Sequence, residues 1–229
     1  MHNRNTIGDI GENAVIKLLV SPPHLYHACT LPYRGRNGID VVAWRRGRGA
    51  VGQWDDTPDV VRFIEVKSTS GSFDANHQPT YSDYQKQGGH RFVANRLTAS
   101  LHYSAERKNA HKTDASKSPF KTKVYRSCGS ACNGTFDVED IDRATLVEKL
   151  IDWLDQAWFE EEDGKPRQLL NQAEIDALLE AGGNAADVDP YRADKRTIRA
   201  RFEIAKVENV NTSTGAVGPI TTNINWTKF

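Results

Sequence analysis

The chain has 229 residues, of which 38% are hydrophobic and 26% charged, and its 30 lysines and arginines are balanced by 30 aspartates and glutamates. This composition predicts a soluble globular protein, and it excludes a membrane-spanning helix because no apolar run approaches the ~18 residues that a span requires. Because the formal net charge is zero, a positive field over the whole surface cannot be the argument for nucleic-acid binding, and charge has to be judged segment by segment.

The first predicted element is a helix from about Thr6 to Val20. Thr6 followed by Asp9 resembles a capping box, and apolar residues then recur at three- and four-residue spacing until the Ser-Pro-Pro of residues 21–23. The segment Leu25–Leu31 predicts a short strand after this helix. The polar residues before Thr6 lack the apolar stretch of a secretory signal peptide.

Two segments of β-branched and aromatic residues follow, at Ile39–Trp44 and Val60–Lys67, with a polar, glycine-containing connection between them. Such a pair predicts a β-hairpin with a long loop. Ser82, with Gln85 three residues later, forms a second capping box and predicts a helix that continues to about Glu106.

Residues 107–122 are rich in lysine, serine, threonine and asparagine, which predicts an exposed loop. The later predicted elements are strands at Lys123–Ser127 and Gly134–Val138, helices at Leu146–Ala157 and Ala173–Ala181, and a C-terminal hairpin formed by a strand from Ile198 and a partner at Thr221–Phe229. We therefore expect an α/β (α+β) fold, a mixed central sheet flanked by helices. Residues 1–160 would form the main domain, and residues 161–229 a helical and β-hairpin extension packed on or beside it.

Three cysteines are too few for a disulfide framework. Cys128 and Cys132 are spaced more widely than a usual zinc-binding pair, and no second pair accompanies them. A turn, closed or not by a small disulfide, is the preferred interpretation over a zinc site.

Glu65 and Lys67 stand out because they are charged residues inside an apolar strand. The two-residue period of a strand places their side chains on one face, with Val66 opposite. Burial of an unpaired charge costs several kcal/mol, so these groups should be paired, bound to a ligand or at the wet end of the strand. Asp40 begins the preceding strand, and its carboxylate approaches Glu65 if the hairpin register allows it.

Asp40 and Glu65 are candidate ligands for Mg²⁺ or Mn²⁺, because carboxylates supply the hard oxygen donors that these ions prefer. Such an ion stabilises the charge of a pentacoordinate phosphate and acidifies a water. Lys67 would hold the attacking water and neutralise the phosphate, since an ammonium is a compact cation with a tunable pKa. The residues therefore indicate metal-dependent hydrolysis of a phosphodiester.

The order of these residues resembles that of the PD-(D/E)XK nuclease superfamily. A helix with Glu12 comes first, Asp40 follows, and Glu65 and Lys67 come last, while Ile39 stands where the written motif has proline. The resemblance implies a restriction-endonuclease-like core, which is a four-stranded mixed sheet flanked by helices. It also implies that Asp40 and Glu65 bind the metal, that Lys67 is the catalytic lysine, and that Glu12 is an accessory acid.

The segment Ser82–Gly89, which leads into Val93, Arg96 and Leu97, resembles PD-(D/E)XK domains of bacterial polymorphic toxins. In those domains a glutamine on the helix after the catalytic strand borders the site, and Gln85 takes that role by resemblance. The resemblance covers about residues 5–105. It implies a toxin or effector that is delivered into target bacterial cells, acts in their cytoplasm and is guarded by an immunity protein.

Each candidate also has a structural alternative. Asp40 is also explained as a turn residue at a strand start, and Glu12 as a solvated helix glutamate. Gln85 is also explained as the partner of Ser82 in the capping box. The acidic stretch Asp137–Asp163 is read either as a solvated helix face or as the docking surface of an inhibitor protein.

Nucleic-acid contacts are expected from a basic segment, residues 107–126, which would make binding salt-dependent; a solvated loop is the alternative. The candidate phosphate-binding residues in it are Lys108, Lys112, Lys117 and Lys121.

The expected function is that of a divalent-metal-dependent nuclease with DNA as substrate. An RNase toxin that acts on tRNA with the same site and a restriction or repair endonuclease remain alternatives, because the fold does not encode the sugar. A non-catalytic nucleic-acid-binding module is a third alternative. The two carboxylates argue against it, because they repel phosphate unless a cation lies between them.

Overall fold

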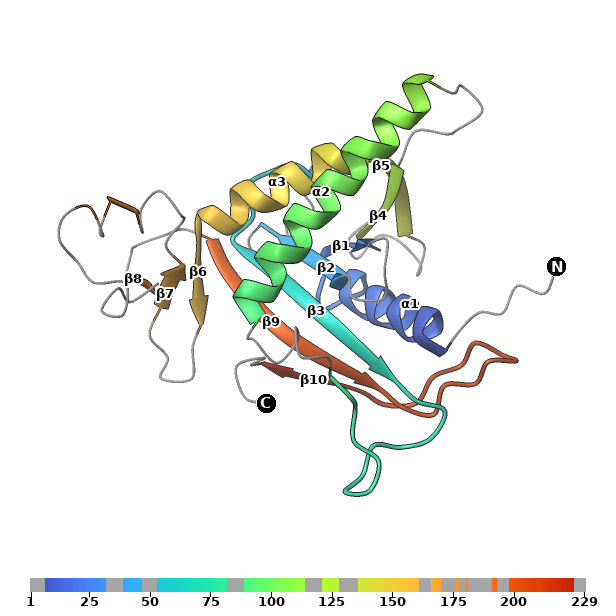
Figure 1. The fold of residues 1–229 in the computed structure, drawn as a ribbon. Coiled ribbons are helices and arrows are strands. Elements are labelled where there is room, and N and C mark those ends of the chain that lie inside the picture. The colour runs from blue at the N-terminus through green and yellow to red at the C-terminus, as the bar shows by residue number, and fades with distance from the viewer. Residues whose placement is uncertain are drawn as a thin grey trace.

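The chain folds as an α+β protein in which helices cover both faces of a mixed sheet (Figure 1). The computed structural model describes residues 7–31, 39–46, 53–81, 89–113, 121–127, 136–160, 166–169, 176–177, 180, 191–192 and 198–224. The helices are α1 (Ile7–Val20), α2 (Gly89–Thr113) and α3 (Arg143–Asp155). The strands are β1 (His27–Leu31), β2 (Ile39–Arg45), β3 (Val60–Ser68), β4 (Lys121–Ser127), β5 (Phe136–Asp142), β6 (Ala157–Glu160), β7 (Pro166–Leu169), β8 (Tyr191–Arg192), β9 (Ile198–Val207) and β10 (Ile220–Ile224).

The centre of the sheet is formed by β2, β3 and β9. The strands follow the order β5-β4-β1-β2-β3-β9-β6-β7-β8, and β10 pairs with the C-terminal half of β9. β2 and β3 form the antiparallel hairpin that the sequence predicts, whereas β9 runs parallel to β3 along its whole length. A segment close to the C-terminus therefore lies beside β3 in the middle of the sheet, a position that the sequence patterns did not predict.

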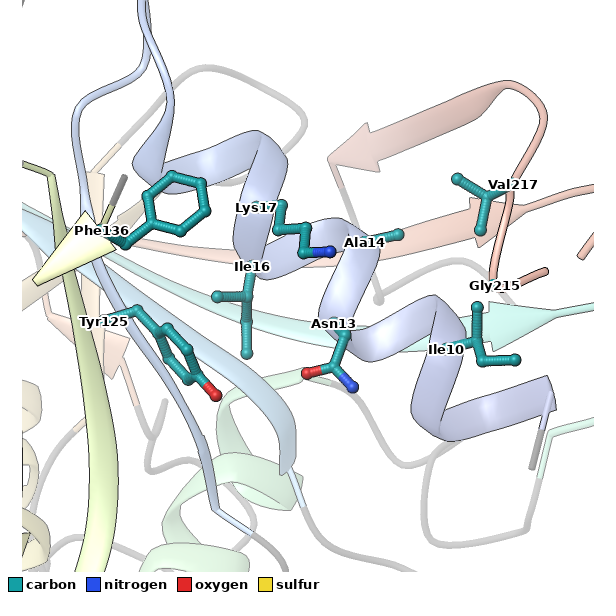
Figure 2. Close-up of a pocket in the computed structure, with 9 residues that line it drawn as sticks. All are labelled: Ile10, Asn13, Ala14, Ile16, Lys17, Tyr125, Phe136, Gly215 and Val217. Carbon is teal, nitrogen blue, oxygen red and sulfur yellow. The ribbon is translucent and has the colours of Figure 1, made fainter. Parts of the chain in front are cut away.

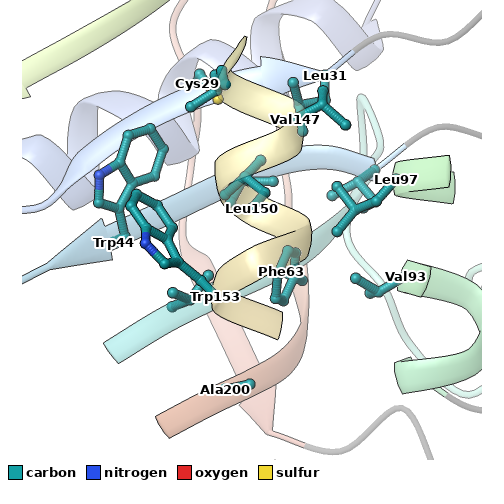
Figure 3. Packing of buried hydrophobic residues seen from close by; sticks show 14 of the residues in the cluster. Cys29, Leu31, Trp44, Phe63, Val93, Leu97, Val147, Leu150, Trp153 and Ala200 are labelled. Atoms are coloured by element: carbon teal, nitrogen blue, oxygen red, sulfur yellow. The ribbon is translucent and has the colours of Figure 1, made fainter. Parts of the chain in front are cut away.

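One face of the sheet is covered by α2 and α3. The N-terminus of α3 is capped by Asp142, whose side chain accepts a hydrogen bond from Thr145 N at 3.0 Å. Apolar residues at three- and four-residue spacing then bury one side of the helix against Trp44 (Figure 3). Full burial of each such side chain contributes roughly 1.5–3 kcal/mol, so this layer fixes the helices on the sheet. The buried residues that α2 and α3 contribute include Val93, Leu97, Leu146, Leu150 and Trp153.

The opposite face is covered by α1. Val15, Ile16 and Leu19 are buried there in one core with Val41 and Ile64. The same face contains a buried ion pair between Arg62 of β3 and Glu203 of β9, with one bond, from Arg62 Nε to Glu203 Oε1, of 2.9 Å. This pair joins the two parallel strands directly.

Several boundaries differ from the predicted ones. Residues 107–113, predicted as a loop, are the last turns of α2. Their polar composition is also that of an exposed helix, because lysine, arginine and alanine are good helix formers. Asp137–Asp142, expected on a helix face, is the exposed edge strand β5, where charged side chains discourage pairing with other chains. Ala157, expected to end a helix, begins β6.

Some predictions fall on residues that the structure does not describe. They include the start of the helix at Ser82, the pair Cys128 and Cys132, and most of the helix predicted at residues 173–181. In the described part of the chain, no helix has the length and apolar character that a membrane span requires.

Candidate active site

The register of the β2-β3 hairpin brings Asp40 to Glu65. Val41 pairs with Ile64, so the next position along the antiparallel ladder sets Asp40 opposite Glu65. The Asp40 carboxylate accepts a hydrogen bond from the backbone N–H of Val66 at 2.7 Å. This bond holds the carboxylate against β3, so the condition that the sequence left open, a suitable hairpin register, is met.

Glu65 and Lys67 form an ion pair at the end of β3. Lys67 Nζ lies 2.8 Å from Glu65 Oε1, which places both side chains on one face, as the two-residue period predicts. Glu65 is 5% exposed, and the side chain of Lys67 is 19% exposed. The ammonium thus compensates a carboxylate that is costly to bury, and it remains accessible to a ligand from solvent.

The charges around Asp40 are not balanced. Burial raises the pKa of Asp40 well above its usual value, and the carboxylates of Glu65 and Glu12 raise it further. The hydrogen bond from Val66 and the ammonium of Lys67 lower the pKa but do not cancel the rise. Carboxylates forced together in this way are typical of functional sites, where a substrate or a cation supplies the missing positive charge.

Glu12 reaches the rim of the same cluster from α1. Burial, followed by the charges of Asp9 and Glu65, raises the pKa of Glu12 from 4.5 to about 7. Because Glu12 also acts on Asp40, the three carboxylates of Glu12, Asp40 and Glu65 lie within electrostatic range of one another.

Gly11 determines how closely α1 approaches β3. A Cβ atom at this position would lie 1.9 Å from Ser68 Oγ and 3.0 Å from Ser68 Cβ, both shorter than normal contacts. A side chain at residue 11 would therefore require Ser68 or the helix to shift. The neighbouring residue, Glu12, owes its position at the site to this close packing.

We predict that Gly11→Ala lowers the free energy of unfolding by roughly 1–3 kcal/mol, because the added methyl group must move Ser68 or the helix. The matched control is Gly8→Ala, the same change at an exposed position of α1, which should raise the free energy of unfolding by about 0.5–1 kcal/mol. Urea unfolding measures both. In a double-mutant cycle, Ser68→Gly should recover part of the loss, and equal stability of the two alanine variants would contradict the packing described.

The donor atoms of the site suit Mg²⁺ or Mn²⁺. Asp40 and Glu65 supply hard oxygens, and Mg²⁺ is usually bound by one or two carboxylates together with waters and substrate phosphates. Within the described residues, no three histidine, cysteine, aspartate or glutamate side chains form a preassembled metal-binding group. The arrangement suits an ion held jointly by Asp40, Glu65 and a substrate.

Two residues beside the site were missed in the sequence. The ring centre of Tyr81 lies 5.3 Å from Lys67 Nζ, and burial and the charge of Glu65 raise the pKa of its hydroxyl. Lys206 of β9 is the direct neighbour of Lys67 in the parallel register. No sequence pattern marks Tyr81 as a site candidate. Lys206 could have been noticed as a charged residue in an apolar strand, but only the fold places it beside Lys67.

Of the predicted phosphate-binding lysines, those in described elements do not belong to the strands that form this site. Lys108 and Lys112 lie in the C-terminal half of α2, which projects beyond the sheet at the top of Figure 1, whereas β3 ends at the lower right. Lys121 is the exposed first residue of β4. Lys117 and Gln85 lie outside the described residues.

A separate hollow of about 510 Å³ lies on the outer side of α1, between this helix, β4, β5 and the β9-β10 connection (Figure 2). The described residues of its lining are mainly apolar and include no carboxylate, with Ile10, Ile16, Tyr125, Phe136 and Val217 among them. This hollow therefore differs in character from the cluster of charged groups at the ends of β2 and β3.

Comparison with known proteins gave no match: no protein-family model fits the chain, and no curated protein or solved structure is similar to it.

Proposed function

We propose that this chain is a divalent-metal-dependent nuclease of the PD-(D/E)XK type that hydrolyses phosphodiester bonds of DNA. The observation that carries the proposal is the arrangement of Asp40, Glu65 and Lys67 at the end of one β-hairpin. The hairpin register sets the two carboxylates opposite each other, and the ammonium lies 2.8 Å from one of them. Carboxylate, carboxylate and lysine follow in the order that the superfamily motif has.

The burial of these charges supports catalysis over binding alone. Asp40 and Glu65 raise the electrostatic energy of the folded state, since the pKa of Asp40 is raised by burial and by Glu65. They would also repel a phosphate. A protein that only binds nucleic acid has no use for such a pair, whereas a hydrolase can use it to hold a cation against the scissile group.

Each residue of the site has a separate role in this proposal. Asp40 and Glu65 would hold Mg²⁺ or Mn²⁺, which when bound supplies charge neutralisation at the phosphate and a more acidic water. Lys67 is fixed by Glu65 in reach of the same point, where its ammonium orients the nucleophile and neutralises a phosphate oxygen. Tyr81 covers Lys67 on one side and limits the access of bulk water.

The test is cleavage of supercoiled plasmid and of total RNA by the purified chain with Mg²⁺, with Mn²⁺ and with EDTA. We expect cleavage with either metal, with DNA preferred, and none with EDTA. Glu65→Gln, purified in the same way, controls for a contaminating nuclease. Absence of cleavage under all conditions would overturn the proposal, and cleavage of RNA alone would change the substrate to RNA while keeping the site.

As a biological setting we propose an antibacterial toxin that is restrained by an immunity protein, a setting supported by the family resemblance alone. Expression of the wild type in bacteria should then reduce viability and degrade the chromosome, and Glu65→Gln should be harmless at equal protein level. A harmless but active wild type would favour a restriction or repair enzyme.

A further inference from the structure

A polar cleft of about 290 Å³ adjoins Lys67. Its other side is formed by the 69–81 connection, the segment that follows β3, through Phe73, His77, Gln78 and Thr80. The volume is just below the roughly 300 Å³ at which pockets for small ligands start. The cleft extends the candidate active site from the end of β3 over the connection that follows this strand.

Lys206 places a second positive charge beside this cleft, where it contacts Gln78 and Phe73 of the cleft lining. It pairs with Lys67 in the parallel β3-β9 register, and both side chains lie on the same face of the sheet. Lys206 Nζ is 3.5 Å from Gln78 Oε1 and 5.7 Å from the ring centre of Phe73. Within the described residues it makes no salt bridge, whereas the charge of Lys67 is compensated by Glu65. Lys206 is thus the lysine of this pair whose charge is open to an anion.

The connection that forms the cleft is anchored on β9 and on the β9-β10 connection. Thr69 N donates to Val207 O at 3.0 Å, and Asn209 N donates to Gly71 O at 2.8 Å. The backbone N–H of Phe73 donates to Glu208 Oε1 at 2.6 Å. These bonds hold the wall of the cleft in place before a ligand arrives.

Acidic residues close to the cleft are engaged by the backbone. Glu208 accepts the bond from Phe73, and Asp74 Oδ1 accepts bonds from the N–H groups of Asn76 and His77 at 2.8 and 2.9 Å. Glu208 and Asp74 each use one carboxylate oxygen in these bonds, and the contacts of Lys206 within the described residues are with a neutral amide and an aromatic ring. A tetrahedral anion is the ligand that this combination suits.

We propose that the cleft binds the backbone phosphate next to the scissile one, with Lys206 as its cation. This inference rests on the proposed nuclease function. Neighbouring strands are about 4.8 Å apart, and lysine side chains are long and flexible, so adjacent lysines can reach consecutive phosphates of one nucleic-acid strand. Lys67 lies at the carboxylates and faces the scissile phosphate, and Lys206 faces the following one. The site would thereby fix the direction of the strand.

The test is binding of a short fluorescent single-stranded oligonucleotide to the full chain in EDTA, measured by anisotropy over a range of salt concentrations. Lys206→Gln should bind roughly tenfold more weakly at low salt, and the slope of log K against log[salt] should fall by about 0.7, the value of one lost phosphate contact on a single strand. Lys206→Arg should retain the slope. The matched control is Lys17→Gln, which removes the same charge from an exposed position of α1, the helix that covers the opposite face of the sheet.

A second variant keeps Lys206 intact. Gln78→Glu, at an exposed position, would place a carboxylate beside Lys206 and should weaken binding and reduce the slope as Lys206→Gln does. With an active enzyme, both variants should raise KM more than they lower kcat. Unchanged binding by both, or an equal loss in Lys17→Gln, would overturn the phosphate site.

The outcomes separate this inference from the proposed function. If the wild type cleaves DNA and Lys206→Gln binds as the wild type does, the nuclease function is supported and the phosphate site is contradicted. If the wild type cleaves nothing but binding still depends on Lys206, the nuclease function is contradicted and the phosphate site is supported as part of a binding module.

Discussion

Asp40→Asn is expected to reduce the rate of phosphodiester cleavage by at least about 10²-fold and, at the same time, to raise the stability of the metal-free protein. Loss of a residue that merely supports a metal ligand already costs 10- to 100-fold, so loss of a ligand should cost more. The stability gain follows from the raised pKa of Asp40: its charged form is disfavoured in the folded state by burial and by Glu65. Asparagine is neutral, has the same shape and can still accept the hydrogen bond from Val66.

Lys67→Ala is the counterpart of this change. It should lower cleavage by about 10²- to 10⁴-fold, the usual contribution of a positioned proton-transfer or charge-stabilising group. It should also lower the free energy of unfolding by up to about 3 kcal/mol, because Glu65 is 5% exposed and would lose its ammonium partner. The two variants thus share a loss of activity and differ in the sign of the stability change.

Plasmid cleavage in Mg²⁺ and urea unfolding in EDTA measure the two quantities. Glu139→Gln, at an exposed position of the edge strand β5, is the control for removing a carboxylate and should alter neither by much. Stability is expected to rise by roughly 1 kcal/mol in Asp40→Asn, which is the size of change that follows when an active-site strain is relieved. An Asp40→Asn variant that keeps full activity would remove this residue from the site.

The stability of the folded protein is expected to depend strongly on pH and on divalent metal. Glu12 has a pKa near 7 in the folded chain against 4.5 for the unfolded one, so between these values the folded state holds a proton that the unfolded state has released. The stability of the metal-free protein therefore contains a contribution that is complete below about pH 4.5 and is lost as pH rises through about 7. At 1.36 kcal/mol per pKa unit its size is about 3 kcal/mol at most, and solvent screening of a half-buried group reduces it.

The comparison that isolates this contribution is wild type against Glu12→Gln, by urea unfolding in EDTA at pH 5 and pH 8. The variant should lose less stability between the two pH values than the wild type does. The difference between the proteins is the useful quantity, because His24, whose pKa is lowered by burial, shifts the stability of both in the opposite direction. Equal pH dependence of the two proteins would contradict the burial of Glu12 at the site.

Divalent metal should counteract the loss of stability at high pH. Ligand carboxylates must be deprotonated to bind, so Mg²⁺ or Mn²⁺ should raise the melting temperature more at pH 8 than at pH 5. At a concentration 100 times Kd the stabilisation would be about 2.7 kcal/mol. Asp40→Asn should lose most of this shift, and Glu139→Gln should retain it. A metal-induced shift that is equal in all three proteins would place the ion elsewhere.

The features that could be predicted from the sequence are those that depend on residues close together in the chain. The two-residue period put Glu65 and Lys67 on one face, and the Lys67–Glu65 ion pair follows from that parity. The spacing of apolar residues determined α1, and β-branched residues determined the β2-β3 hairpin, so the position of Asp40 at the start of β2 was also readable. These features depend on residues close together in the chain, where side-chain period and propensity act directly.

The remaining features of the site depend on the tertiary structure. Lys206 is separated from Lys67 by more than half of the chain, and only the parallel pairing of β9 with β3 makes them neighbours. Glu12 lies near the carboxylates because Gly11 lets α1 pack against Ser68, a contact that no spacing within the helix predicts. The raised pKa values of Asp40 and Glu12 arise from burial and from charges on other elements. The sequence singled out Asp40, Glu65 and Lys67 as candidates, and the fold decided which charges surround them, because burial and long-range pairing are properties of the assembled sheet.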